Sequence, residues 1–137
     1  MQRLLRALQT AYADRGIAVT TSLDEQVIIR GDERDVMEIV GNLLENAFKY
    51  TRTGVRVGLT RSANQRDRAK IAIEDDGDGI PAELREEVLR RGRRLDEMQS
   101  GQGIGLAVVA ELVELHQGNL EITDSELGGA CITVTLG

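Results

Sequence analysis

Apolar residues recur every three or four positions in three stretches of the chain, which predicts three helices. The first covers residues 1–15, where Gly16 follows as a stop signal. The second covers residues 32–50 and starts from Asp32, a residue type that favours the position just before a helix. The third covers residues 104–117.

Shorter stretches in which apolar and polar residues alternate predict strands. They lie at residues 17–21, 27–30, 55–62, 70–75, 119–123 and 130–136. We expect the first two to form a hairpin, because only a short polar turn separates them. Pro81 is well placed to begin a short further helix that runs to about Arg91. The order of elements predicts an α+β fold: a two-layer α/β sandwich with one mixed sheet of about five or more strands and three main helices on one face.

Composition limits the function classes that fit. The 137 residues suffice for one domain with a real core, and 41% apolar with 29% charged residues is typical of a globular protein. The formal net charge of −6 argues against broad binding of nucleic acid or anionic membranes. One cysteine and one histidine exclude an internal disulfide and a histidine-rich metal site. No apolar run approaches the ~20 residues of a membrane span.

The segment Glu74–Pro81, with the sequence EDDGDGIP, ends one predicted strand with carboxylates and glycines. Asp75 has the parity of Ile71 and Ile73 and therefore points with them toward the core, whereas Asp76 does not. A carboxylate is costly to bury, so Asp75 either meets a donor or lies in a pocket. The alternative is a plain acidic turn with a solvated Asp75, because Asp-Gly pairs are common turn formers.

A polar stripe follows the predicted helix at residues 32–50, largely opposite the apolar one. Its members are Glu38, Asn42, Glu45, Asn46 and Lys49. One interpretation is a solvated face. The other is a functional face, because asparagine is a poor helix former and exposed faces normally use Glu, Lys or Arg.

Residues 92–105, GRRLDEMQSGQGIG, lack periodicity, and loops of this length are usually functional lids or disordered segments. The glycines at positions 101, 103 and 105 open the third helix, where free N–H groups and the helix dipole form an anion site. Arginines at positions 90, 91, 93 and 94 make the region basic, so phosphate is the expected guest. The pattern is neither a P-loop nor a Rossmann fingerprint, and a glycine-rich loop can also be a simple flexible connection.

Three segments together carry a resemblance to a known superfamily. They are GNLLENAFKYT at 41–51, EDDGDGIP at 74–81 and GQGIGLAV at 101–108. In this order they resemble the nucleotide-binding boxes of the Bergerat-fold (GHKL) ATPases and kinases. Within that superfamily the pattern Asn-x-x-x-Asn-Ala-x-Lys-Tyr at 42–50 is similar to sensor histidine kinases. The segment RGRRLDEMQSGQGIGLAV also resembles the lid of PhoQ-type magnesium-sensing kinases.

The resemblance implies that the chain binds Mg²⁺-ATP. Asp75 would accept a hydrogen bond from the adenine amino group, and Gly77 and Gly79 would let the base and ribose approach closely. Asn46 would bind Mg²⁺ through its amide oxygen, a neutral ligand suited to a metal already held by phosphates. The implied ATP-binding set is Asn42, Asn46, Lys49, Tyr50, Asp75, Gly77, Gly79, Ile80, Arg93, Arg94, Gly101, Gln102, Gly103, Ile104, Gly105 and Leu106. Asn42, Lys49 and Arg94 are its implied catalytic residues, and Asn46 and Gln102 its implied metal ligands.

Asn42 separates a kinase from an ATPase within this superfamily. Gyrase-like members have a Glu there, four residues before the magnesium-binding Asn, and that Glu activates water. An asparagine cannot act as a general base. The resemblance therefore implies transfer of the γ-phosphate to a histidine of a separate dimerisation domain, and from there to a response regulator. His116 is interpreted as a helix-end residue and not as the acceptor.

Two positions depart from the pattern of the superfamily. Many relatives carry proline where this chain has Asp78, which adds negative charge near the nucleotide. The phenylalanine of the lid motif is absent, and Leu89 stands near its place. Both differences bear on the lid and not on the nucleotide site itself.

Residues 1–15 are expected to be a first helix or the tail of a connection from the dimerisation domain, and residues 16–137 the catalytic domain. The resemblance implies a cytoplasmic domain of a bacterial inner-membrane sensor, monomeric and soluble as a fragment, with no nucleic-acid or membrane contact. Two alternatives stay open. One is an anti-sigma-factor-type serine kinase, whose partner would carry phosphoserine; the other is a degenerate regulatory module that binds partners without nucleotide.

Overall fold

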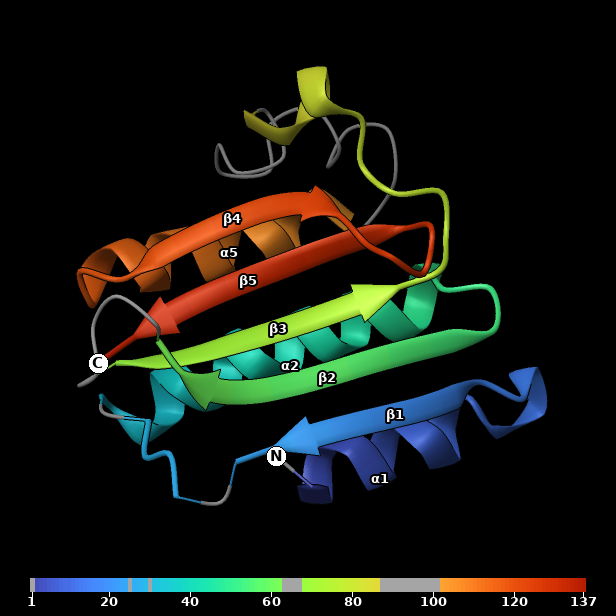
Figure 1. Cartoon of the computed structure of the whole chain (residues 1–137), viewed down its shortest axis with the longest axis horizontal. Helices are drawn as coiled ribbons and strands as arrows, with labels where there is room; N and C mark the ends of the chain where they lie inside the picture. The colour runs from blue at the N-terminus through green and yellow to red at the C-terminus, as the bar shows by residue number, and fades with distance from the viewer. Residues whose placement is uncertain (1, 25, 30, 63–67, 87–101) are drawn as a thin grey trace.

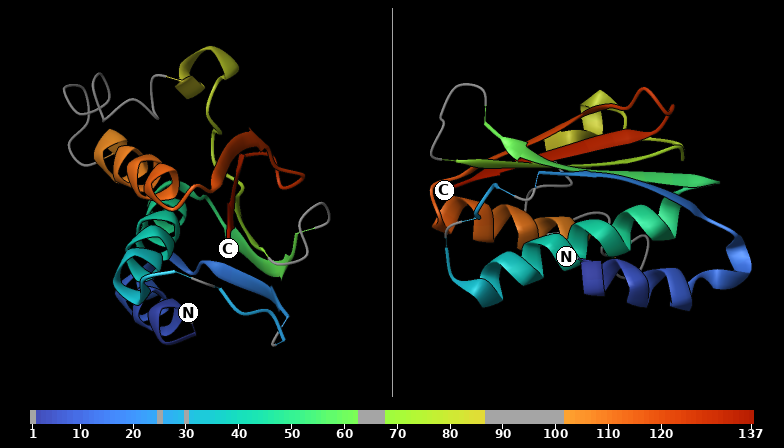
Figure 2. Two further views of the ribbon diagram at one scale, coloured as in Figure 1. Left: turned by 90° about the vertical axis from the view of Figure 1, so that its left-hand side faces the viewer. Right: turned by 60° about the horizontal axis from the view of Figure 1, so that its bottom comes forward.

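The structure is a computed structural model that describes residues 2–24, 26–29, 31–62, 68–86 and 102–137. Within these residues one five-stranded sheet and three helices form two layers, with the helices together on one face of the sheet (Figures 1 and 2). The helices are α1 (Gln2–Ala11), α2 (Glu33–Tyr50) and α5 (Gln102–Leu115). The predicted two-layer α/β sandwich is confirmed.

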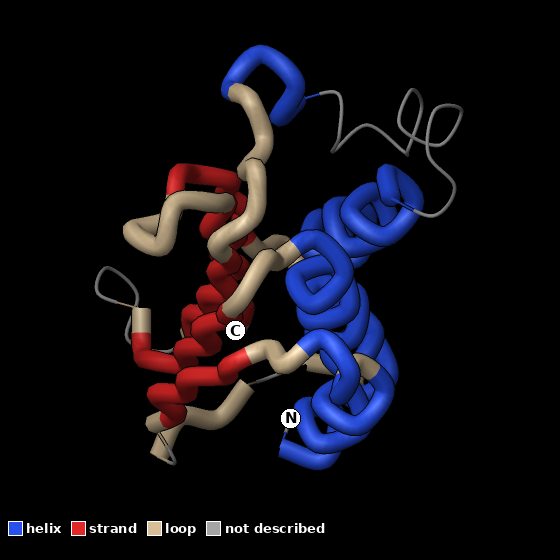
Figure 3. The backbone as a smooth tube through the Cα atoms, turned by 90° about the vertical axis from the view of Figure 1, so that its right-hand side faces the viewer, coloured by secondary structure: helices blue, strands red, loops and turns tan. Residues whose placement is uncertain are grey.

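The sheet is mixed, as predicted. Its strands are β1 (Ala18–Leu23), β2 (Gly54–Arg61), β3 (Ala69–Asp75), β4 (Asn119–Asp124) and β5 (Ala130–Leu136). Their order across the sheet is β1-β2-β3-β5-β4. β1 runs parallel to β2 and the other neighbours are antiparallel. Figure 3 shows the strands as one layer and the helices as the other.

The predicted hairpin between residues 17–21 and 27–30 is wrong. The first segment pairs with β2, and the described part of the second forms no strand. Asp24 redirects the chain, because its carboxylate accepts a hydrogen bond from the Gln26 N–H (3.0 Å) and its carbonyl accepts one from the Val27 N–H (3.1 Å). This turn leads away from the sheet to α2, which then serves as the crossover that two parallel strands require.

α2 lies at the centre of the helical layer and contributes a large part of the core (Figure 2). The predicted cap is confirmed, since the Asp32 carboxylate accepts hydrogen bonds from the N–H groups of Arg34 (2.8 Å) and Asp35 (3.4 Å). The buried residues of the helix are Ile39, Val40, Leu43, Leu44, Ala47 and Phe48. Among the described residues Phe48 has the largest fully buried side chain, although it was not one of the apolar positions that predicted α2.

Several element ends differ from the prediction. α1 stops at Ala11 and is followed by a 3-10 turn, η1 (Ala13–Arg15), which Gly16 closes with a positive φ of 63°. α5 begins two residues before the predicted Ile104. After Pro81 the structure describes the 3-10 turn η2 (Ala82–Leu84) and helical residues to 86, while the rest of the predicted short helix lies outside the described residues.

α2 and α5 are antiparallel. The beginning of α2 contacts the end of α5, because Asp35 Oδ2 lies 2.7 Å from His116 Nε2. The last turns of α2 therefore lie at the end of the helical layer where α5 begins. The end of β3 lies there too, because Gly77 packs against the backbone of Tyr50. Within the described residues no helix is both long and apolar enough to cross a membrane.

Candidate functional site

Asp75, the last residue of β3, points toward the helical layer. Every second residue of β3 is buried, and Asp75 belongs to that set with 7% of its surface exposed. Its Oδ1 accepts hydrogen bonds from the N–H groups of Gly77 (2.9 Å) and Ala130 (3.4 Å). The parity prediction is confirmed, and a solvated acidic turn is excluded for this residue.

Burial raises the pKa of the Asp75 carboxyl above its ordinary value. The hydrogen bonds from Gly77 and Ala130 act in the opposite direction, and the charge of Asp76 adds to the increase. These protein donors are neutral backbone groups, so they compensate the buried charge only in part. Perturbed carboxyl groups of this kind are concentrated at functional sites.

Glycines allow the backbone to close around Asp75. A Cβ atom at Gly77 would collide with the carbonyl oxygen of Tyr50, and one at Gly129 would collide with Asp75 itself. Gly79 has a φ of 75°, which glycine adopts without strain. The close approach of Gly129, which lies between β4 and β5, was not predicted, because the sequence shows there only an ordinary Gly-Gly turn.

The predicted asparagine face lies in the second half of α2. Asn42 and Asn46 are partly exposed and Lys49 is exposed, so the face is neither core nor fully solvated. The Asn42 side-chain amide donates to the Glu38 carbonyl (2.8 Å), a bond within the helix. This bond uses one N–H of the amide and leaves its oxygen and its second N–H uninvolved.

Tyr50, at the end of α2, carries a hydroxyl that needs a partner. The oxygen is buried and has no hydrogen-bond partner among the described residues. Burial raises the pKa of Tyr50, and Tyr12 contributes in the same direction. An unpaired buried hydroxyl costs about 1–3 kcal/mol. Lys49 Nζ lies 5.9 Å from the centre of the Tyr50 ring.

Asp76 is the residue of this region that sequence analysis missed. Its carboxylate accepts hydrogen bonds from the N–H groups of Arg52 (2.8 Å), Thr53 (2.9 Å) and Gly54 (3.3 Å). The hydroxyls of Thr51 (2.6 Å) and Thr53 also contact it. Desolvation acts to raise the pKa of Asp76, but the hydrogen bonds from Thr51 and Thr53 hold this pKa well below its ordinary value. The only sequence signal was a turn with two threonines directly after α2.

The glycine-rich segment opens a helix, as predicted. Residues 102–105 form the first turn of α5, whose N–H groups have no partner within the helix, and such a helix end favours an anion. The side chain of Leu106 is buried in the core, so a contact with a ligand would involve its backbone. Arg93, Arg94 and Gly101 lie outside the described residues.

Of the two positions that depart from the superfamily pattern, the structure describes only Asp78. Asp78 faces solvent with its side chain 87% exposed, and it pairs with Arg52. Leu89 lies outside the described residues. His116 bonds to Asp35, which agrees with its interpretation as a helix-end residue.

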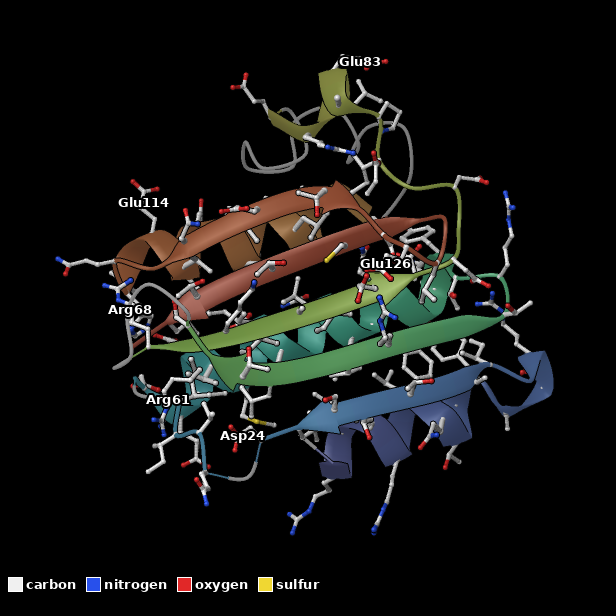
Figure 4. All side chains as sticks on the ribbon, viewed as in Figure 1. Asp24, Arg61, Arg68, Glu83, Glu114 and Glu126 are labelled. Carbon is white, nitrogen blue, oxygen red and sulfur yellow. The ribbon has the colours of Figure 1, made fainter. Side chains whose placement is uncertain are left out.

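The basic side chains at the far end of the sheet do not belong to the site. Figure 4 shows Arg61 and Arg68 at the end of the sheet where β3 begins, and Glu126 at the end where β3 stops. Arg68 also donates to the carbonyl of Gln117 (2.9 Å). A phosphate group near Asp75 is thus out of reach of these two arginines.

A magnesium ion fits this site only together with a ligand that carries it. In the described ranges no group of three or more His, Cys, Asp or Glu side chains could hold a metal ion. Mg²⁺ commonly keeps ligands from phosphates and water and takes one or two from the protein. The partly exposed amide of Asn46 fits that role.

Comparison with protein families identifies one match. The family described as "Histidine kinase-, DNA gyrase B-, and HSP90-like ATPase" matches residues 31–137. This range contains α2, the Asp75 segment, the start of α5 and every strand except β1.

A curated relative extends the match to almost the whole chain. "Two-component sensor PhoQ" of Pseudomonas aeruginosa is 37% identical over 134 residues, which are 98% of this chain. The chain spans only 29% of that relative's length.

Solved structures show the same fold. A mycobacterial sensor histidine kinase, MprB, has a TM-score of 0.80 and 29% identity, covering 98% of this chain and 91% of that one. The ATP-binding domain of PrrB from Mycobacterium tuberculosis has a TM-score of 0.73 and 31% identity, covering 98% of this chain and 90% of that one.

Proposed function

Because the chain belongs to the family of histidine kinase-, DNA gyrase B- and HSP90-like ATPases, we propose that it is the ATP-binding catalytic domain of a two-component sensor histidine kinase. In this function the domain binds Mg²⁺-ATP and presents its γ-phosphate to a histidine of a separate dimerisation domain. The observation that carries the proposal is the buried carboxylate of Asp75, surrounded by close-packed glycines at the end of β3.

Asp75 selects the base. Both of its backbone hydrogen bonds end on Oδ1, so Oδ2 is the oxygen that the amino group of adenine would reach. The adenine amino group is a neutral donor, which suits a carboxylate whose charged form burial already disfavours. Guanine would place a carbonyl oxygen at that position instead of a donor. Gly77 and Gly79 are proposed to let the base and ribose approach the backbone closely, because neither residue carries a side chain.

The phosphates would lie between the end of α2 and the start of α5. The free N–H groups of residues 102–105 and the positive end of the helix dipole favour negative charge. Lys49 and Tyr50 would contact the phosphates from α2, and Arg93 and Arg94 are proposed to reach them from the segment before α5. Mg²⁺, bound to the phosphates, to Asn46 and to Gln102, would neutralise charge during transfer.

Asn42 makes transfer to a protein acceptor the expected reaction. It lies one turn before Asn46 on the same partly exposed face of α2, where its amide cannot take a proton from water. The nucleotide is thus held without a base that would activate water. The acceptor histidine is proposed to come from the dimerisation domain, and the phosphate would pass next to a response regulator.

The parent protein is proposed to be a membrane-anchored bacterial sensor whose cytoplasmic part includes this domain, since the relatives are sensor proteins of which this chain spans about 29%. We also propose that α1 belongs to the domain, because Leu5 is buried in the same core as α2 and the sheet. The fragment is expected to be monomeric.

Two measurements test the proposed function. Calorimetry should show binding of Mg²⁺-ADP; no detectable binding would favour a nucleotide-free regulatory module. Incubation with labelled Mg²⁺-ATP and a purified dimerisation domain should label a histidine, which loses its phosphate in acid. An acid-stable label on a partner's serine would instead support the serine-kinase alternative.

A further inference from the structure

The connection between α2 and β2 is held by the side chain of Asp76, the residue that directly follows β3. Residues 51–53 have no regular structure and Gly54 begins β2, so residues 51–54 form the short turn between the two elements. Three consecutive N–H groups of this turn and its two threonine hydroxyls contact the carboxylate of Asp76. One carboxylate thus replaces the hydrogen bonds that a regular element would have supplied. Figure 1 shows this turn and the end of β3 at the same end of the molecule.

The contact is partly buried and is not a surface ion pair. Thr51 is only 2% exposed, and its hydroxyl lies 2.6 Å from Asp76 Oδ1 and 2.6 Å from the Gly54 carbonyl oxygen. Next to it, Gly77 packs so closely on the Tyr50 carbonyl that no side chain would fit. The end of α2 therefore cannot shift without moving the segment that follows Asp75.

A cation holds the other side of the same helix end. The guanidinium of Arg15 donates to the carbonyl oxygens of Phe48 (2.6 Å), Lys49 (3.3 Å) and Thr51. These are carbonyls that the end of a helix leaves without partners, and a cation also suits the negative end of the helix dipole. The carboxylate of Asp76 therefore accepts hydrogen bonds from the N–H groups of the turn, while Arg15 donates hydrogen bonds to the carbonyls at the end of α2.

We propose that Asp76 is a positioning residue for the phosphates of the nucleotide: by holding the turn at 51–54, it fixes the last turn of α2, which carries Lys49 and Tyr50. This inference rests on the proposed function. Asp76 does not touch the nucleotide in this role. It acts on the phosphate side of the site, whereas Asp75 accepts hydrogen bonds from Gly77 and Ala130 and is also fixed by the pairing of β3 with its neighbours.

The test compares two nucleotide ligands in one variant. Asp76→Asn should weaken binding of Mg²⁺-AMP-PNP on the order of tenfold, because small displacements of phosphate contacts are expensive. Binding of adenosine, which lacks phosphates, should change less than about twofold. Both affinities are measured on the 137-residue chain by competition with a fluorescent nucleotide, at a temperature where denaturation curves show each variant folded.

Asp78→Asn is the control for charge, because it removes the same charge from the same loop at a side chain that is 87% exposed and whose ion pair with the Arg52 side chain lies at the surface. It should leave both affinities within about twofold of the unchanged chain. If Asp76→Asn does not fold, Thr53→Val removes one donor to the carboxylate at an exposed residue, and a smaller loss confined to AMP-PNP is expected.

Equal losses for AMP-PNP and adenosine, or no loss for either, would overturn the positioning role and leave the proposed function standing. Failure of the unchanged chain to bind Mg²⁺-AMP-PNP would overturn the proposed function and this inference with it.

Discussion

At the scale of single residues, two adjacent carboxylates at the end of β3 have opposite environments. Asp75 points into the core and meets two backbone N–H groups, and burial raises its pKa. Asp76 points to the α2–β2 turn, where hydrogen bonds from Thr51 and Thr53 outweigh desolvation and lower its pKa. Asp76 therefore stabilises the fold above its ordinary pKa and loses that contribution as the pH falls. Asp75 favours the fold only when protonated and loses that contribution as the pH rises through its folded-state pKa.

Asp75→Asn should separate nucleotide binding from folding. The amide oxygen can still accept from the N–H groups of Gly77 and Ala130, but the amide cannot offer the charged acceptor that adenine would meet. We expect Mg²⁺-ADP to bind at least about tenfold more weakly by calorimetry. The free energy of unfolding in urea at pH 7 should not fall, since the variant removes a carboxylate that is disfavoured when ionised. Unchanged affinity would refute the adenine role.

Asn46→Ala should reveal the metal ligand. The partly exposed amide at this position is proposed to bind Mg²⁺ that the phosphates carry. We expect the variant to lose most of the gain in nucleotide affinity that Mg²⁺ confers, on the order of tenfold. Affinity measured with a chelator should stay close to that of the unchanged chain. A loss of equal size with and without chelator would count against a metal ligand.

At the scale of elements, α2 is capped at both ends by charged side chains. Asp32 accepts from the first free N–H groups, and Arg15 donates to the last free carbonyls. The first cap lies next to the helix in the chain. The second comes from η1, on the segment between α1 and β1. The end of α2 that carries the candidate phosphate contacts is thus held by long-range bonds.

Arg15→Met should destabilise the fold, because the carbonyls of Phe48 and Lys49 lose charged donors. Methionine keeps a long apolar side chain against Tyr12, whose ring centre lies 5.8 Å from the Arg15 guanidinium carbon. We expect the free energy of unfolding to fall by about 1–3 kcal/mol in urea denaturation. Arg6→Met, at an exposed position of α1, is the control and should change stability by less than about 0.5 kcal/mol. Equal effects of the two variants would show that Arg15 is not a cap.

At the scale of the whole molecule, the site exists because three elements end in one place. The contact between Asp35 and His116 shows that α2 and α5 are antiparallel, so the last turns of α2 lie at the end of the helical layer where α5 begins. β3 ends there as well, with Gly77 against Tyr50. Rapid hydrolysis would need a carboxylate that activates water at position 42 of α2, where this chain has the amide of Asn42.

The isolated chain should therefore hydrolyse ATP very slowly, far below the about 1 s⁻¹ at the low end of ordinary enzymes. Release of phosphate from Mg²⁺-ATP is the measurement. A preparation of Asp75→Asn, which should not bind nucleotide, reports any contaminating ATPase. Brisk turnover that disappears in this variant would contradict the reasoning from Asn42.

The sequence by itself determined the features that depend on neighbouring residues. Helical periodicity and the Asp32 cap predicted α2 to its last residue, and strand parity placed Asp75 in the core. The order of the three motifs predicted the family. These features follow from side-chain spacing and from hydrogen bonds within a few residues, which a linear pattern records.

The tertiary structure alone decided which distant segments meet. β1 pairs with β2 across a helix and not with the described residues 27–29, because Asp24 turns the chain away from the sheet. Asp76 holds Thr53 from 23 residues away, and Arg15 reaches Thr51 across 36 residues. No local sequence pattern specifies such partners. Donors and acceptors at the ends of elements form these hydrogen bonds only when packing of the core brings the ends together.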